Sequence, residues 1–228
     1  MCGLFGFLHY GRNKIKDLSN ITNVLAEEAA VRGTDATGIA YNLKGKLCID
    51  KNSKSAYDMT FKHSNNVTAL TGHTRHSTQG DKKFNYNNHP FYGSCSNTKF
   101  ALAHNGVLIN DKDLKQEYKL PKTKIETDSY VAVQLLEHKD KLDFESLKFM
   151  TENVEGSFSF SVLDSNNNLY LIKGDSPLSI LHFPKEKIYI YASTEEILWK
   201  ALIETDLFID IKDNNYEQVK ISDGDILR

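Results

Sequence analysis

The sequence predicts an α+β fold in a single domain that spans residues 1–228. Strand-like and helix-like segments come in blocks rather than in strict alternation, which favours a layered α+β fold over a doubly wound parallel sheet. The chain has 228 residues, of which 40% are hydrophobic, so it is long enough for one well-buried core and short for two. Neither a repeat nor a low-complexity linker divides the sequence.

The first half of the chain is expected to begin with a buried strand and a helix. Residues 4–10 form an apolar run, and the apolar positions that follow recur at helical spacing up to Gly33, with Asp17 or Ser19 available as the N-cap. Apolar runs predict further strands at residues 37–43, 46–51, 67–75 and 99–104. The polar segment 76–90 has a length that is typical of functional or mobile loops.

The second half is expected to hold three helices, four strands, one more helix and a final strand pair. Helical spacing predicts helices at residues 110–119, 127–139 and 144–153. Strands are expected at residues 157–164, 169–173, 178–183 and 187–192, followed by a helix at 194–203. The dipeptide Asp223-Gly224 predicts a turn between two strands near residues 218–227.

Composition and charge exclude several classes of protein. A formal net charge of −2 gives no global attraction to nucleic acid or to an anionic membrane, so neither is expected as a partner. Apolar runs fall short of the ~18–20 residues of a membrane span, and the N-terminus does not resemble a signal peptide, so a cytoplasmic location is expected. The three cysteines are expected to be free thiols. The four histidines between residues 73 and 104 match no familiar ligand spacing, so no metal or cofactor is expected.

Cys2 has a special position, because removal of Met1 would leave it with both a thiol and a free α-amine. The unperturbed thiol titrates near ~8.5 and the α-amine near ~7.7–8.0, so the amine can accept the thiol proton at neutral pH. One residue would then supply a nucleophile and a general base. Alternatively, Cys2 is only a small apolar residue that happens to follow the start codon, without a function of its own.

Two polar motifs lie at the ends of predicted strands and helices. In Arg32-Gly33-Thr34-Asp35, the arginine and the aspartate are expected to pair and to pin a turn that supports a site. Arg75 lies at a strand end and is suited to bind a carboxylate with two parallel hydrogen bonds, helped by Thr78 and nearby backbone N–H groups. The alternative is an arginine that faces solvent.

Two further motifs suggest polar groups for catalysis and binding. Asn105 and Gly106 together offer a side-chain amide and a backbone N–H, the donor pair of an oxyanion hole, although an Asn-Gly dipeptide is also typical of a turn. Asp128 lies at a predicted helix start, where it can cap the helix or face a substrate ammonium.

Seven motifs in order resemble those of the class II glutamine amidotransferases. They are Met-Cys-Gly-Leu-Phe-Gly, Arg-Gly-Thr-Asp-Ala-Thr-Gly, Gly-His-Thr-Arg-His-Ser-Thr-Gln-Gly, Asn-His-Pro, His-Asn-Gly, Glu-Thr-Asp-Ser and Val-Glu-Gly-Ser-Phe. The resemblance implies an N-terminal nucleophile hydrolase fold, a four-layer αββα sandwich with mainly antiparallel sheets. It implies Cys2 as the nucleophile, Arg32 as a support of the N-terminal strand, and Asn105 with Gly106 as the oxyanion hole. Substrate-binding roles are implied for Arg75, His76, Thr78 and Asp128.

The resemblance implies hydrolysis of the glutamine side-chain amide through a thioester on Cys2, with ammonia passed to a synthase subunit. No synthase domain is expected within residues 1–228, so the acceptor is expected to be a partner unless the protein is a free-standing amidase. An oligomer is compatible with this activity. His76 and Gln79 depart from the residues of some family members, which affects the expected contacts of the lid. The alternatives are an amidase for another amide, or a non-catalytic binding module if Met1 is retained.

Overall fold

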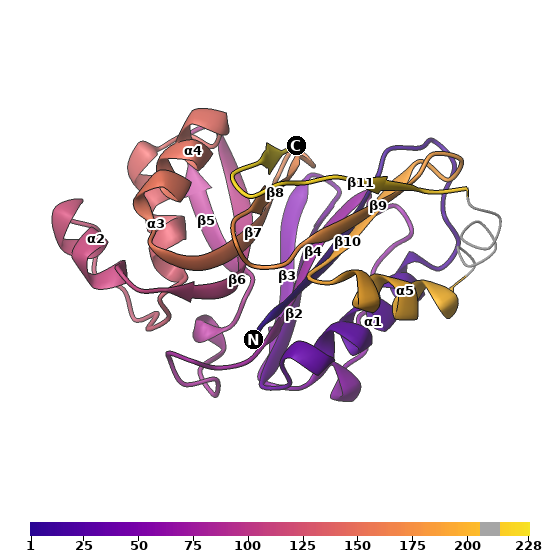
Figure 1. Cartoon of the computed structure of the whole chain (residues 1–228), viewed down its shortest axis with the longest axis horizontal. Helices are drawn as coiled ribbons and strands as arrows, with labels where there is room; N and C mark the ends of the chain where they lie inside the picture. The colour runs from indigo at the N-terminus through magenta and orange to yellow at the C-terminus, as the bar shows by residue number, and fades with distance from the viewer. Residues whose placement is uncertain (206–214) are drawn as a thin grey trace.

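The computed structural model describes residues 1–205 and 215–228, which form two antiparallel sheets with helices on their outer faces (Figure 1). This arrangement confirms the predicted α+β sandwich of four layers. Every helix in the described part of the chain is too short or too polar to serve as a membrane-spanning segment.

The first sheet has seven strands in the order β11-β9-β10-β1-β4-β2-β3, and all of its pairings are antiparallel. Its strands are β1 (Gly3–His9), β2 (Ala36–Leu43), β3 (Lys46–Asn52), β4 (Ala69–Arg75), β9 (Ser179–Phe183), β10 (Ile188–Ala192) and β11 (Glu217–Val219). Strand β1 lies in the middle, where Phe5 is opposite Gly72 of β4 and Ala192 of β10. The N-terminal strand is therefore hydrogen-bonded on both edges.

The second sheet has five strands in the order β12-β8-β7-β6-β5. Its strands are β5 (Phe91–Cys95), β6 (Thr98–Leu108), β7 (Gly156–Asp164), β8 (Leu169–Lys173) and β12 (Ile226–Leu227). The long central strand β6 pairs with β7 from Phe100 to Leu108. Both strands next to β6 are joined to it by antiparallel ladders, so its residues have fixed neighbours on each side.

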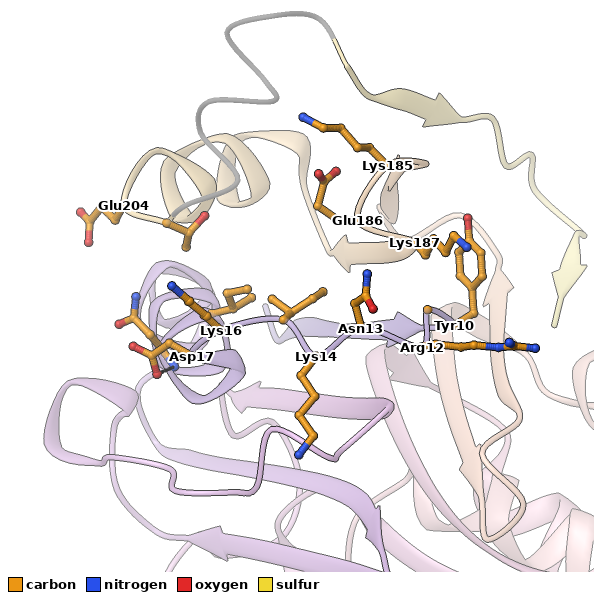
Figure 2. Close-up of a pocket in the computed structure, with 15 residues that line it drawn as sticks. Tyr10, Arg12, Asn13, Lys14, Lys16, Asp17, Lys185, Glu186, Lys187 and Glu204 are labelled. Carbon is orange, nitrogen blue, oxygen red and sulfur yellow. Dashed lines mark hydrogen bonds between the residues drawn. The ribbon is translucent and has the colours of Figure 1, made fainter.

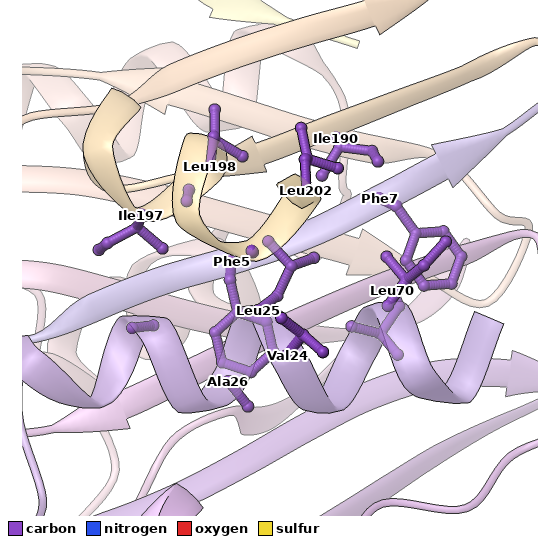
Figure 3. Packing of buried hydrophobic residues seen from close by; sticks show 14 of the residues in the cluster. Phe5, Phe7, Val24, Leu25, Ala26, Leu70, Ile190, Ile197, Leu198 and Leu202 are labelled. Atoms are coloured by element: carbon purple, nitrogen blue, oxygen red, sulfur yellow. The ribbon is translucent and has the colours of Figure 1, made fainter. Parts of the chain in front are cut away.

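The alternation of side chains along β1 builds two separate cores. Phe5 and Phe7 point to the outer face of the seven-stranded sheet, where α1 (Leu18–Ala29) and α5 (Glu195–Ile203) cover them (Figure 3). Leu4 points the other way and packs with Ala103 of β6 between the two sheets. Successive residues of a strand face opposite sides, and both sides are buried here, so β1 reads as a continuous apolar run.

The other outer layer covers the five-stranded sheet and consists of three helices, α2 (Asp111–Glu117), α3 (Tyr130–Lys139) and α4 (Phe144–Asn153). Leu135 of α3 and Leu147 of α4 are fully buried in a core that also contains Phe100 and Phe160. In Figure 1 this layer lies at the opposite end of the molecule from α1 and α5. The two sheets therefore form the middle of the sandwich.

Three features of the fold differ from the expectations. The final strands do not form a hairpin, because β11 pairs with β9 in one sheet and β12 pairs with β8 in the other. The strand β5 was not predicted, since its glycine and polar residues alternate with only a few apolar ones. Strand β6 continues four residues beyond the predicted end at His104, because β7 pairs with it as far as Leu108.

Candidate functional site

Cys2 lies at the start of the central strand, beside the segment that follows β4. The His76 N–H points to Cys2 Sγ at an N···S distance of 3.5 Å, and Sγ lies 3.6 Å from the His76 carbonyl oxygen. Burial raises the pKa of the Cys2 thiol, while the His76 N–H and the positive charge of Arg75 act in the opposite direction. A backbone donor and a nearby cation are groups that stabilise a thiolate.

Arg32 holds the N-terminal segment by its backbone. It ends the short 3₁₀ helix Ala30–Arg32, and its Nε donates to the Cys2 carbonyl oxygen at 2.6 Å. The expected pair between Arg32 and Asp35 is wrong, because Asp35 instead accepts from the Ser77 N–H at 2.8 Å and pairs with Lys82. Arg32 thus positions Cys2, and Asp35 fixes the segment after β4.

Arg75, the last residue of β4, is only 3% exposed. Its Nη1 donates to Asn88 Oδ1 at 2.6 Å, and its Nη2 donates to the carbonyl oxygens of Gln79 and Gly80 at 2.6 and 2.8 Å. No carboxylate forms an ion pair with this guanidinium in residues 1–205 and 215–228. A buried arginine is normally paired with an anion, so Arg75 is suited to bind an anionic ligand.

The other predicted residues of segment 76–90 make few side-chain contacts with the described part of the chain. The His76 and Thr78 side chains are exposed, and Thr78 makes no side-chain hydrogen bond to any described residue. Gln79 Nε2 donates to the Glu126 carbonyl oxygen at 2.8 Å, which ties the segment to the turn before α3. His76 therefore contacts Cys2 by its backbone, and Gln79 serves as a brace of the loop.

Asn105 and Gly106 lie inside β6, so the alternative interpretation of a simple turn is wrong. Asn105 Nδ2 lies 3.4 Å from Ser193 Oγ, and the same hydroxyl accepts from the Leu4 N–H at 2.8 Å. Ser193 thereby links β6 to the strand that follows Cys2. Gly106 has φ +145°, and a Cβ at this position would lie 2.0 Å from the Ser157 carbonyl oxygen. The strand needs glycine here, both for its conformation and for the close approach of β7.

Asp128 does not cap a helix by its side chain. Helix α3 begins at Tyr130, and Asp128 Oδ2 accepts instead from the Leu108 N–H of β6 at 2.7 Å. The residue is 4% exposed, and its negative charge raises the pKa of Cys2. Asp128 and Arg75 are therefore both close enough to Cys2 for their charges to act on its thiol, and they form no ion pair with each other.

Ser193 and Asn88 were missed as members of the site by sequence reasoning. The Ser-Thr pair before α5 indicates a helix cap, which is the role of Thr194, and gives no sign that Ser193 connects two sheets. Asn88 belongs to the polar segment 76–90, yet it is fully buried and contacts Arg75. The hydrogen bonds of Ser193 and Asn88 join residues that are distant in the sequence, so the local sequence pattern does not reveal them.

Three of the four histidines are buried and take no part in a metal site among the described residues. His104 Nδ1 lies 2.8 Å from Ser129 Oγ, and His73 Nε2 lies 3.0 Å from the His104 carbonyl oxygen. Burial lowers the pKa of His73 to about 3, so its imidazole is neutral at physiological pH. His73 thus links β4 of one sheet to β6 of the other, and His104 links β6 to the residue before α3.

Hollows in the described part of the chain also lie outside the cluster around Arg75. A cavity of about 890 Å³ is bounded by the turn after β1 and the turn between β9 and β10, and none of the predicted site residues lines it (Figure 2). Its cationic side chains do not converge on one point, and Lys14 extends away from its neighbours in this view. A smaller hollow of about 290 Å³ lies next to Met1 and Arg32, at the beginning of the chain.

In a comparison with protein families, residues 73–200 match the model described as a glutamine amidotransferase domain. This match covers more than half of the chain. Among similar proteins is glutamine–fructose-6-phosphate aminotransferase of Streptococcus agalactiae, 32% identical over 193 residues, which are 79% of this chain and 30% of that protein. The enzyme of the same name from Listeria innocua is 32% identical over 220 residues, with 93% of this chain and 34% of that protein covered. The chain spans about a third of the length of these relatives.

Solved structures agree on the fold. Glutamine phosphoribosylpyrophosphate amidotransferase from B. subtilis superposes with a TM-score of 0.70 and 23% identity, over 88% of this chain and 43% of that one. A second structure, described as the allosteric regulatory enzyme of purine biosynthesis, gives a TM-score of 0.71 at 23% identity over the same shares. The sandwich of two antiparallel sheets is thus shared with amidotransferase chains.

Proposed function

Since the chain belongs to the glutamine amidotransferase domain family, we propose that it hydrolyses the side-chain amide of glutamine to glutamate and ammonia. The observation that carries this proposal is the position of Cys2, whose sulfur contacts the backbone directly after a buried arginine without a carboxylate partner among the described residues. A nucleophile beside an unpaired cation suits a substrate that combines an acyl group with a free carboxylate.

The proposed nucleophile is the thiolate of Cys2 after Met1 has been removed. The α-amine takes the thiol proton, and sulfur attacks the δ-carbonyl carbon of glutamine. Asn105 Nδ2 and the Gly106 N–H are the proposed donors to the oxyanion, and loss of one such donor costs about 2.7–4 kcal/mol of barrier. The C–N bond then breaks, the α-ammonium gives its proton to the departing ammonia, and water hydrolyses the thioester to release glutamate.

The two ends of the amino acid are assigned to opposite charges. Arg75 is proposed to bind the α-carboxylate. Three of its five N–H donors form hydrogen bonds to described residues, and the other two have no partner among these residues and are available to a ligand. Asp128 is proposed to bind the α-ammonium through Oδ1, because Oδ2 already accepts from Leu108. His76 and Thr78, both exposed, would close over the bound substrate.

Ammonia is proposed to pass to a synthase unit that uses it. The relatives carry this kind of transfer in their names, as an aminotransferase of fructose 6-phosphate and an amidotransferase of phosphoribosylpyrophosphate. The chain spans about a third of the length of the curated relatives, so the proposed hydrolysis of glutamine does not by itself identify the acceptor of the ammonia.

The experiment is an assay of glutamate and ammonia release from L-glutamine, with intact mass used to establish that Met1 is absent. Cys2→Ala is expected to abolish release of both products while the protein stays folded. Cys48→Ala is the matched control, because that thiol is half-buried in another strand and is expected to leave turnover unchanged. Turnover by Cys2→Ala, or faster hydrolysis of a different amide, would contradict the proposal.

A further inference from the structure

Lys51 is a half-buried cation whose ammonium contacts the loop that follows β4. It lies near the end of β3, and its Nζ donates to the carbonyl oxygens of Asn88 at 2.5 Å and Pro90 at 3.0 Å. The same ammonium lies 5.2 Å from the centre of the Phe91 ring. In the described part of the chain, no carboxylate pairs with Lys51, so backbone carbonyls and an aromatic ring take the place of a counter-ion.

Asn88 connects this lysine to Arg75. Its side-chain Oδ1 accepts from Arg75 Nη1 at 2.6 Å, while its main-chain oxygen accepts from Lys51. Its Nδ2 donates to Ser53 Oγ at 3.1 Å and to the Lys82 carbonyl oxygen at 3.0 Å. A side chain that is fully buried and hydrogen-bonded at both ends has little freedom, so the position of Asn88 determines the position of the guanidinium.

Two cations flank Asn88, and the carboxylates of Asp35, Asp81 and Asp128 act on Arg75 without forming an ion pair with it among the described residues. Lys51 and Arg75 bring two positive charges to one asparagine, and burial together with Arg75 lowers the pKa of Lys51 to about 8. The neighbouring His73 and His89 are neutral, because burial lowers the pKa of each. An anionic group bound at Arg75 would give the guanidinium a counter-charge in direct contact, since close opposite charges attract strongly where water is excluded.

We propose that Lys51 is a positioning residue that acts through Asn88 to hold Arg75 ready for the α-carboxylate of the substrate. This inference rests on the proposed function, because it takes the ligand of Arg75 to be the carboxylate of glutamine. Lys51 does not touch the substrate. It donates hydrogen bonds to the carbonyl oxygens of Asn88 and Pro90, and so fixes the position of the part of segment 76–90 that contacts the Arg75 guanidinium.

The test measures binding without turnover, by calorimetry of L-glutamine with the Cys2→Ala protein. Adding Lys51→Met removes the charge and two hydrogen bonds while keeping most of the apolar stem. It is expected to weaken binding roughly 3- to 30-fold, which lies within the range of coupling between residues in one network. Lys51→Arg keeps the charge and is expected to restore most of the affinity. Lys46→Met, an exposed position of the same strand, is the matched control and should leave affinity unchanged.

A second ligand separates positioning from general destabilisation. The α-carboxamide of L-glutamine keeps the side chain and the ammonium but has no carboxylate, so Lys51→Met is expected to leave its affinity unchanged. In combination with Asn88→Ala, Lys51→Met should add little further loss for L-glutamine, because both changes interrupt the same connection.

Each outcome decides the question. Equal weakening for both ligands would show that Lys51 only supports the fold, and unchanged affinity for L-glutamine would also overturn the inference. Binding that depends on Lys51 in a protein whose wild-type form does not hydrolyse glutamine would uphold the inference and overturn the proposed function. If the Cys2→Ala protein does not bind L-glutamine at all, both are overturned.

Discussion

The two sides of the candidate site are held by different kinds of interaction. On one side, Asn105 and Gly106 lie in a central strand, and Cys2 adjoins another, so backbone pairing fixes their positions. On the other side, Arg75 meets segment 76–90, which is held mainly by hydrogen bonds of side chains, both amides such as Asn88 and charged groups such as Asp35. The difference teaches that the strand side cannot move without unfolding the sheet, whereas the loop side can open locally.

This contrast predicts how substitutions divide between chemistry and binding. Changes on the strand side should lower kcat, because they displace the proposed nucleophile or the proposed oxyanion donors, and should also lower stability. Changes on the loop side should raise the KM for glutamine with little effect on kcat or on the melting temperature. The predictions below run from the largest expected effect to the smallest.

Gly106→Ala is expected to have the largest effect, on the strand side. The added Cβ would lie 2.0 Å from the Ser157 carbonyl oxygen, and the φ of +145° is unfavourable for alanine. Displacement of the oxyanion donors should lower kcat for glutamine hydrolysis at least ~100-fold. Steady-state kinetics and thermal unfolding measure the two consequences.

Gly45→Ala is the matched control for that change. Gly45 also has a positive φ, of +74°, but a Cβ there would meet no atom within 4 Å. This variant should lose about 1 kcal/mol of stability from its backbone conformation and keep its kcat. If Gly106→Ala behaves in the same way as the control, then Gly106 is not an oxyanion donor.

Asp128→Asn is expected to have the next largest effect, at the boundary of the two sides. The amide oxygen can still accept from the Leu108 N–H, but the negative charge proposed to bind the substrate ammonium is gone. Loss of a hydrogen bond to a charged group is worth ~1.5–3 kcal/mol, so the KM for glutamine should rise roughly 10- to 100-fold. Asp128→Ala should show the same rise together with a lower melting temperature, because the Leu108 N–H then loses its acceptor.

An unchanged KM in Asp128→Asn, with a large loss of stability in Asp128→Ala, would instead assign Asp128 a structural role alone. Both variants are needed because Asp128 Oδ2 accepts from the Leu108 N–H, whereas Oδ1 has no partner among the described residues and is available to a ligand.

The strand side could be predicted from the sequence far better than the loop side. The apolar run at β1 and the Asn-Gly pair are local patterns, and the resemblance to a family placed both beside the nucleophile. Lys51, by contrast, lies in a strand of alternating polarity and reads as a solvated residue. Its ammonium instead donates to the carbonyl oxygens of Asn88 and Pro90, which are 37 and 39 residues away in the sequence.

The details that failed have the same physical origin. The Arg32–Asp35 pair was predicted from proximity in the sequence, but Cys2 and Lys82 provide partners that only the folded chain brings near. The predicted final hairpin failed because the two sheets compete for its strands, which the Asp-Gly turn signal cannot reveal.

Asn87→Ala tests the loop side directly. Asn87 is fully buried; its Oδ1 accepts from the Glu126 N–H at 3.0 Å, and its Nδ2 donates to Glu126 Oε2 at 2.8 Å. Removal of these bonds should favour the open loop and raise the KM for glutamine roughly 3- to 30-fold. Asn65→Ala, with an exposed side chain, is the control. A fall in kcat at constant KM would contradict the division between the two sides.

The smallest predicted effect is a pH dependence of glutamine affinity that comes from Lys51. Its pKa of about 8 in the folded protein lies below the ordinary value of 10.5, so between these values the unfolded chain binds more protons and the contribution of this lysine to stability rises with pH. Affinity should change in the opposite direction. Above pH 8 or so, Lys51 loses its proton, and only one of the two positive charges beside Asn88 remains. The KM for glutamine should then rise a few-fold.

The control for this pH effect is Lys51→Arg, which stays charged over the whole range. The substrate ammonium and the α-amine of Cys2 titrate equally in both proteins, so the ratio of their KM values isolates Lys51. His73 and His89 stay neutral between pH 7 and 9 and do not enter the ratio, because burial keeps the pKa of His73 at about 3 and that of His89 well below its usual value. A constant ratio across pH 8 would show that the charge of Lys51 does not support binding, and would leave only its hydrogen bonds to the loop as its contribution.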